Sequence, residues 1–166
     1  MANMMPTVYV DTSVFIYLTT PPSKDRDKAT RQQITKDWWA TKRQKFELFV
    51  SQPVYEEFWL PEKVPSEEAH RRFVLLQENT VLLPLWRDIG EILKIAGLLL
   101  EPAGPLPRKA DVDAIHWAVA SYYGCDYLLT WNFKHLNNAQ VKRTAERILR
   151  NHGYEVPTIC SPEELI

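Results

Sequence analysis

The feature that most constrains the fold of this chain is the regular alternation of short apolar runs with longer segments of helical character. Five apolar runs, each bounded by polar or turn residues, occupy residues 7–10, 46–50, 81–85, 127–130 and 156–160. Runs of this length and composition are typical of buried strands. Apolar residues at helical spacing predict helices between them, at residues 26–45, 66–79, 88–100, 111–123 and 138–151, with Gly153 as the last stop signal.

Strands that alternate with helices predict an α/β fold, in which a central parallel sheet of about five strands has helices on both faces. The proline-rich stretches at residues 19–25 and 101–109 are typical of loops inside a domain rather than of linkers between domains. We therefore expect residues 1–166 to form a single domain.

Composition narrows the class of protein without identifying it. A chain that is 45% hydrophobic and 25% charged is typical of globular proteins, and its formal net charge of -1 does not decide for or against nucleic acid. Cys125 and Cys160 lie far apart without a CxxC pattern, so we expect two buried thiols rather than a zinc site or a disulfide. No apolar run approaches the roughly 20 residues of a membrane span. A cytoplasmic protein without membrane contact is expected.

Polar residues gather where ligands bind in an open parallel sheet, beyond the carboxyl ends of its strands. Four separate segments deliver acids or an amide towards that edge: Asp11, Glu56 and Glu57, Asp111 and Asp113, and Asn132. Any one of these acids alone could be a turn residue, a solvated helix residue or a first-turn acid of a helix. Their joint placement indicates a common site.

Converging carboxylates raise one another's pKa, and a divalent cation removes that cost. Mg²⁺ or Mn²⁺ takes oxygen ligands, keeps several waters and needs only a few protein carboxylates. Such a site suits the hydrolysis of phosphodiesters, in which the metal activates a water and offsets charge on the phosphate.

Four stretches carry a resemblance to a known family: VYVDTSVFIYL, SQPVYEEF, DVDAIHWAVASYYGCDYLLTWNFKHL and PTICSPEEL. In this order and spacing they resemble the PIN domain, especially its VapC-type toxins, over essentially the whole chain. The resemblance implies a parallel sheet between helices and a Mg²⁺ or Mn²⁺ site that cleaves RNA.

The resemblance also implies roles for individual residues. Asp11 matches the first acid, with Ser13 as its hydroxyl neighbour, and Glu57 rather than Glu56 matches the second. Asp113 matches the third acid. These three would hold the metal.

The fourth position of the family, usually Thr-x-Asp, is read here as Thr130-Trp131-Asn132. Asn132 brings no charge, so we expect it to align water or substrate beside a metal that is bound more weakly. Asp111 is then the helix cap or an outer acid.

Several neighbouring residues allow two interpretations. His116, one turn after Asp113, is either a phosphate or water contact or a half-buried packing residue. Arg108 and Lys109 either meet RNA phosphates or belong to a solvated loop. His135 is expected on the same rim as Asn132.

The segment KDWWATKRQKFE interleaves Trp38 and Trp39 with basic residues. Such a pattern could stack on nucleic acid. One of the two tryptophans is expected to pack the helix against the sheet, and exposed aromatics more often mark a protein interface, here that of a homodimer or an antitoxin.

The sequence therefore predicts a Mg²⁺- or Mn²⁺-dependent endoribonuclease that acts as the toxin of a toxin–antitoxin pair, with RNA, an antitoxin and a second copy of itself as partners. One alternative is a weakened PIN-like scaffold that binds RNA or protein without cleavage. Another is a phosphatase with Asp11 as nucleophile, although such enzymes need an acid where this chain has Ser13.

Overall fold

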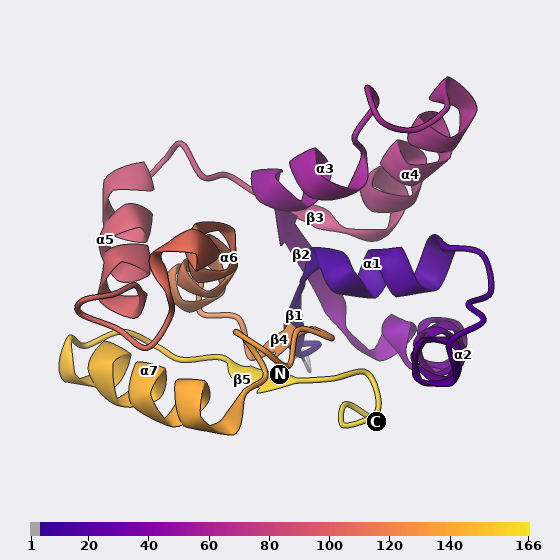
Figure 1. The fold of residues 1–166 in the computed structure, drawn as a ribbon. Helices are drawn as coiled ribbons and strands as arrows, with labels where there is room; N and C mark the ends of the chain where they lie inside the picture. Colours follow the sequence, from indigo (N-terminus) through magenta and orange to yellow (C-terminus); the bar gives the residue numbers. More distant parts are fainter. Residues whose placement is uncertain (1–3) are drawn as a thin grey trace.

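The computed structural model describes residues 4–166, in which strands and helices alternate as expected (Figure 1). The strands are β1 (Thr7–Val10), β2 (Glu47–Ser51), β3 (Val81–Leu83), β4 (Tyr127–Leu129) and β5 (Thr158–Cys160). The α-helices are α1 (Thr12–Thr19), α2 (Arg26–Thr41), α3 (Gln52–Phe58), α4 (Ser66–Asn79), α5 (Ile89–Leu99), α6 (Asp111–Tyr122) and α7 (Ala139–Asn151). Two short 3₁₀ helices are η1 (Arg43–Lys45) and η2 (Arg108–Ala110).

The five strands form one parallel sheet in the order β3-β2-β1-β4-β5, which confirms the expected α/β fold. Helices α5, α6 and α7 lie on one side of the sheet, and α1 and α2 lie on the other (Figure 1). In the central register Val10 pairs with Leu129, so the residues that follow β1 and β4 are neighbours at the carboxyl edge. This register places Asp11 beside Thr130.

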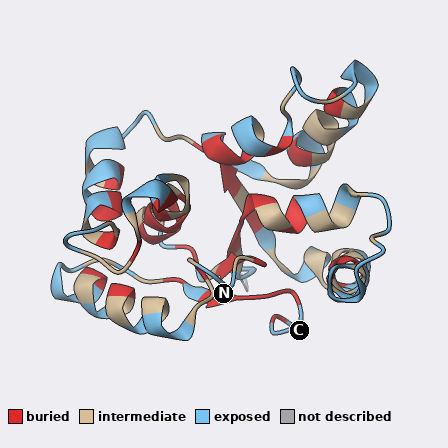
Figure 2. Ribbon diagram, viewed as in Figure 1, coloured by how far each residue is buried: buried red, intermediate tan, exposed pale blue. Residues whose placement is uncertain are grey.

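The hydrophobic core forms where helices cover both faces of β1. Val8, Tyr9 and Val10 are all fully buried, which explains why this strand reads as a continuous apolar run (Figure 2). Helix α6 packs its apolar residues against the same core, and Trp117 is its largest fully buried side chain. A rigid sheet and a buried helix thus carry the polar residues at the carboxyl edge.

Prolines shorten two of the expected strands. The run at 81–85 ends as a strand at Leu83 because Pro84 has no N–H to donate, and the run at 156–160 begins at Thr158, after Pro157. The expected helix at 26–45 ends at Thr41, and its last residues form η1. Gly153 does end α7, at a φ of 80° that favours glycine.

Helix α1 was not among the predicted helices because its sequence, TSVFIYLT, lacks the alternation of polar and apolar faces that marks a surface helix. The start of this helix is nevertheless determined by the residue directly before it. The side chain of Asp11 caps the helix by accepting a hydrogen bond from the backbone N–H of Ser13.

Trp38 is the tryptophan that packs α2 against the rest of the fold, as expected of one member of the pair. This side chain is 3% exposed, and its Nε1 donates to the carbonyl oxygen of Leu165 at 2.7 Å. Trp39 is half-buried and packs edge-on against Phe15. Both tryptophans therefore attach α2 to the rest of the fold.

Cys125 and Cys160 are free and buried, as expected. Burial raises the pKa of each thiol to about 12, so neither is a nucleophile at neutral pH. The helices described for residues 4–166 include none with the length and apolar character needed to cross a bilayer.

Candidate active site

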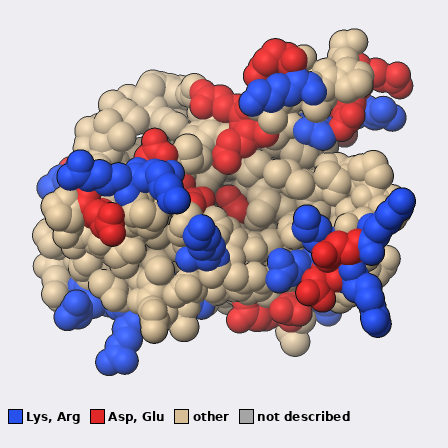
Figure 3. Space-filling model, in the orientation of Figure 1, with Lys and Arg blue, Asp and Glu red and all other residues tan. Residues whose placement is uncertain are grey.

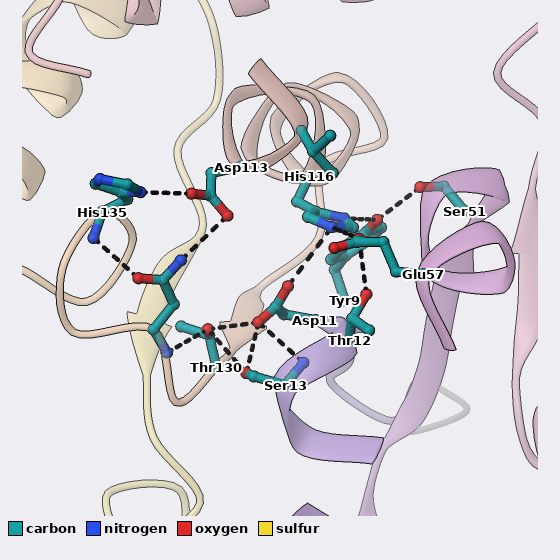
Figure 4. A network of polar contacts seen from close by, with 12 residues as sticks. Tyr9, Asp11, Thr12, Ser13, Ser51, Glu57, Asp113, His116, Thr130 and His135 are labelled. Atoms are coloured by element: carbon teal, nitrogen blue, oxygen red, sulfur yellow. Dashed lines mark hydrogen bonds and ion pairs between the residues drawn. The ribbon is translucent and has the colours of Figure 1, made fainter. Parts of the chain in front are cut away.

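Asp11 lies at the centre of the carboxyl edge and is held there by two hydroxyl groups. Its Oδ2 accepts hydrogen bonds from Ser13 Oγ at 2.6 Å and from Thr130 Oγ1 at 2.8 Å (Figure 4). The carboxylate is 5% exposed. The structure thus brings Ser13 and Thr130, both expected as supporting residues, onto the first acid.

Glu57 reaches the same space from α3, whereas Glu56 does not. Oε1 of Glu57 accepts hydrogen bonds from Thr12 Oγ1 at 2.9 Å and from His116 Nε2 at 2.8 Å (Figure 4). Glu56 instead bonds to Gln52 on the exposed side of the same helix. Burial raises the pKa of Glu57, but the hydrogen bonds and the charge of His116 outweigh burial and leave that pKa below its usual value.

Asp113 comes from the first turn of α6 and is fixed by the loop after β4. Its Oδ1 accepts a hydrogen bond from Asn132 Nδ2 at 3.1 Å, and its Oδ2 lies 2.7 Å from His135 Nδ1 (Figure 4). Burial raises the pKa of Asp113, and the negative charge of Asp11 raises it further against the opposing effect of His135. The third acid therefore senses the negative charge of the first.

The other basic and acidic candidates lie further out. Asp111 is exposed and accepts a hydrogen bond only from the backbone N–H of Val112, so it stays outside the cluster of acids within the described residues. Arg108 and Lys109 are exposed in η2, directly before α6. Their position leaves them free to meet a ligand that approaches Asp113.

Two residues of the site, His116 and Tyr9, form hydrogen bonds that the sequence analysis did not predict. His116 is 1% exposed, so it lies beneath the acids rather than at the surface where a phosphate would bind. Its Nδ1 lies 2.7 Å from the hydroxyl of Tyr9, which lies 2.6 Å from Ser51 Oγ. Tyr9 could have been noticed, because a tyrosine between valines in a buried strand needs a partner for its hydroxyl.

Acidic side chains lie in a hollow at the centre of this face of the molecule. Figure 3 shows lysine and arginine side chains, together with further acids, on both sides of that hollow. Such an arrangement can receive an anionic polymer along its rim while a cation occupies the centre.

The donor atoms fit a hard divalent cation. Glu57 Oε2 accepts no hydrogen bond within the described residues, and Asp11 Oδ1 faces only His116 Nε2, at 3.6 Å. Across residues 4–166, no three His, Cys, Asp or Glu side chains are grouped as a ready-made metal cluster. Mg²⁺ requires no such cluster, since it binds through one or two carboxylates together with waters and substrate phosphates.

Comparison with solved structures finds a similar fold in VapBC and VapC proteins. VapBC2 from Rickettsia felis, solved with a DNA fragment from its promoter, is 9% identical, with 93% of this chain and 98% of that chain covered at a TM-score of 0.61. VapBC-1 from nontypeable Haemophilus influenzae is 18% identical, with 95% and 98% covered at a TM-score of 0.58. VapC20 from Mycobacterium tuberculosis, a toxin that cleaves the sarcin–ricin loop, is 18% identical, with 76% and 91% covered at 0.55.

Similarity at these identities concerns the fold, and no curated protein matches the chain. The sequence itself matches the family model of the PIN domain over residues 8–152. That match runs from β1 to the end of α7 and includes Asp11, Glu57 and Asp113. With its five-stranded parallel sheet and the acids at the carboxyl edge, the chain belongs to the PIN-domain family.

Proposed function

We propose that this protein is a metal-dependent endoribonuclease and the toxin of a toxin–antitoxin pair. The observation that carries the proposal is that Asp11 and Glu57 converge on His116 at the carboxyl edge of a PIN-domain sheet, while Asp113 lies one turn before His116 at the start of α6. VapC20, which shares the fold, is a toxin that cleaves the sarcin–ricin loop, and this supports RNA as the substrate class.

Asp11, Glu57 and Asp113 would hold a Mg²⁺ or Mn²⁺ ion. When bound, such an ion activates a water molecule and offsets the charge of the phosphate. Ser13 and Thr130 fix Asp11 so that only Oδ1 stays open, and Thr12 and His116 do the same for Glu57 through Oε1. Hydrolysis joins the water oxygen to phosphorus as the bond from phosphorus to the leaving oxygen breaks.

Asn132 has a different role from the one expected. Its carbonyl oxygen accepts hydrogen bonds from the backbone N–H groups of Lys134 and His135, at 3.2 and 3.0 Å, and is therefore occupied. Its amide nitrogen donates to Asp113. We assign Asn132 to positioning the third acid rather than to aligning water.

Two substitutions test the proposed active site. Asp11→Asn and Asp113→Asn each remove a charge with little change in shape, and asparagine also serves as an N-cap in place of Asp11. We expect each to lower Mn²⁺-dependent RNA cleavage by at least ~100-fold, since even outer partners of a metal site are worth about 10–100-fold. Cleavage of a total RNA pool is measured beside far-UV circular dichroism, and full activity in either folded variant contradicts the proposal.

The biological part of the proposal is a cytoplasmic toxin that acts as a homodimer and is held inactive by an antitoxin. The similar folds of two VapBC complexes support an antitoxin partner. Expression of the chain should arrest growth, and Asp11→Ala should relieve the arrest. If wild type and Asp11→Ala were equally toxic, growth arrest would not depend on this site.

A second candidate is a scaffold that binds RNA or protein without cleavage. It is favoured by the engagement of both Asp113 oxygens by Asn132 and His135. Calorimetric titration with Mn²⁺ distinguishes the two functions. Absence of binding at millimolar Mn²⁺, together with no cleavage of any RNA, supports the scaffold.

A further inference from the structure

A buried chain of polar side chains runs beneath the acids. It begins at Ser51, passes through the hydroxyl of Tyr9 and the ring of His116, and ends at Glu57 (Figure 4). Its successive distances are 2.6, 2.7 and 2.8 Å, each within normal hydrogen-bond length. His116 Nε2 also lies 3.6 Å from Asp11 Oδ1, so a single nitrogen stands between the first two acids.

The partners of His116 fix the direction of this chain. Nε2 faces only carboxylate oxygens, and ionised carboxylates accept hydrogen bonds without donating, so Nε2 carries a proton. On the other side of the ring, Nδ1 is hydrogen-bonded to the hydroxyl of Tyr9, and that hydroxyl is hydrogen-bonded to Ser51. Every polar atom along the chain is satisfied, and the ring cannot rotate without breaking two hydrogen bonds.

Packing alone does not account for a histidine at this position. His116 lies one turn after Asp113 on a helix whose neighbouring positions hold buried apolar residues such as Ala114 and Trp117. A polar ring that is 1% exposed costs free energy unless it is hydrogen-bonded on both nitrogens, and an apolar side chain would avoid that cost. The ring serves the carboxylates that it contacts.

The position of the Glu57 carboxylate depends on His116 more than the position of the Asp11 carboxylate does. The Glu57 side chain is 42% exposed and sits on a helix of seven residues, and within the described part of the chain only Thr12 and His116 donate to it. Asp11 is 7% exposed at its side chain and is already held by Ser13 and Thr130. Without His116, the Glu57 carboxylate would be free to turn towards solvent.

We propose that His116 is a positioning residue, which holds Oε1 of Glu57 so that Oε2 faces the same space as Oδ1 of Asp11 and can bind a divalent cation. Tyr9 and Ser51 extend this role by fixing the ring. The inference rests on the proposed function of the site, since it names the group that prepares two of its metal ligands.

A matched pair of substitutions tests the inference in the full-length chain. The amide nitrogen of His116→Gln reaches the position of Nε2 and can still donate to Glu57, whereas that of His116→Asn stops at the position of Nδ1. We expect Mn²⁺ affinity, measured by calorimetry, to stay within about 3-fold of wild type for Gln and to fall about 10–100-fold for Asn. Equal affinity of the two folded variants overturns the inference.

The dependence on Glu57 is tested by a double-mutant cycle. Glu57→Gln should weaken Mn²⁺ binding by itself, and His116→Asn should cause no further loss in that background because the residue it positions is gone. Independent, additive losses would show that His116 does not act through Glu57, and would overturn the inference. Ser121→Ala, which changes another buried polar residue of α6 away from the acids, should leave Mn²⁺ affinity unchanged.

Failure of the inference can be distinguished from failure of the proposed function. If the wild-type chain binds no Mn²⁺ and cleaves no RNA, the proposed function falls and the inference falls with it. If the wild-type chain binds Mn²⁺ and cleaves RNA, but His116→Asn binds Mn²⁺ as tightly, only the inference is overturned. Thermal unfolding without metal confirms that each variant is folded before it is titrated.

Discussion

Asn132 sets how much negative charge the site carries. Its amide nitrogen donates to Asp113, and its carbonyl oxygen closes a turn by accepting from the backbone of Lys134 and His135. An aspartate could close the same turn but could not donate to Asp113. It would instead place two like charges side by side, an arrangement that is unfavourable alone and favourable around a cation.

We therefore expect Asn132→Asp to have opposite effects in the two states of the site. Without metal, the variant should be less stable than wild type by roughly 1–3 kcal/mol, because a hydrogen bond to a partly buried carboxylate is replaced by repulsion. With Mn²⁺, it should gain more stability than wild type does. Thermal unfolding with and without Mn²⁺ measures both effects, and an unchanged response to Mn²⁺ would contradict the assigned role.

The sequence indicated where the three acids stand relative to strands and helices, but not which side chains bind them, and their role as metal ligands stays a prediction. Asp11, Glu57 and Asp113 could be predicted because each stands at a recognisable place relative to a strand or a helix start. The contact between Tyr9 and His116 joins residues 107 positions apart, and no local pattern records it. Contacts of this kind follow from the packing of β1 against α6.

At the scale of elements, one hydrogen bond connects α2 to the loop that carries Asn132. Nε1 of Trp131 donates to Thr35 Oγ1 at 2.8 Å, and both side chains are buried. Thr35→Val keeps the shape and removes the acceptor, so we expect a loss of roughly 1–3 kcal/mol from the unpaired Nε1 of Trp131. Urea unfolding measures this loss, and wild-type stability would show that Trp131 finds another partner.

The turn after β5 should make stability depend on pH. The backbone N–H of Ser161 holds the pKa of Glu164 below its usual value, at a distance of 2.7 Å from Oε2. Because the pKa is lower in the folded state, the ionised carboxylate stabilises the fold above the pKa of the unfolded chain. That contribution is lost as pH falls through the folded-state pKa.

Glu164→Gln should accordingly destabilise the protein at pH 7, and its effect should shrink as the pH falls through the folded-state pKa of Glu164. We expect less than about 1 kcal/mol at pH 7, because Glu164 is exposed and solvent screens its interactions. Urea unfolding at several pH values measures the difference. Glu163→Gln, at the exposed neighbouring position, is the matched control and should not reproduce the pH dependence.

Elements were predicted best where polar and apolar residues alternate along a helix or where a whole run is apolar. Helix α1 escaped prediction because it is short and its central residues, VFIYL, form a continuous apolar run, so only tertiary packing distinguishes it from a strand. Strands β3 and β5 are shorter than their apolar runs because proline lies within each run.

At the scale of the whole molecule, charge around the acidic hollow should govern the binding of RNA. Arg108 and Lys109 are exposed directly before α6, so replacing both with alanine should raise the KM for RNA several-fold and lower its dependence on salt. Mn²⁺ affinity should not change, because neither residue contacts the acids. An unaltered KM across salt concentrations would assign both residues to a solvated loop.

The order of the strands also bears on when the protein can act. Strand β1 lies at the centre of the sheet, yet one of its two neighbours, β4, is formed by residues 127–129. A chain emerging from the ribosome therefore carries Asp11 and Glu57 well before Asp113 and the strand that holds Thr130 in place. Under the proposed function, the active site is therefore incomplete until residues 127–130 have been synthesised, and the protein could not cleave its own message before that point.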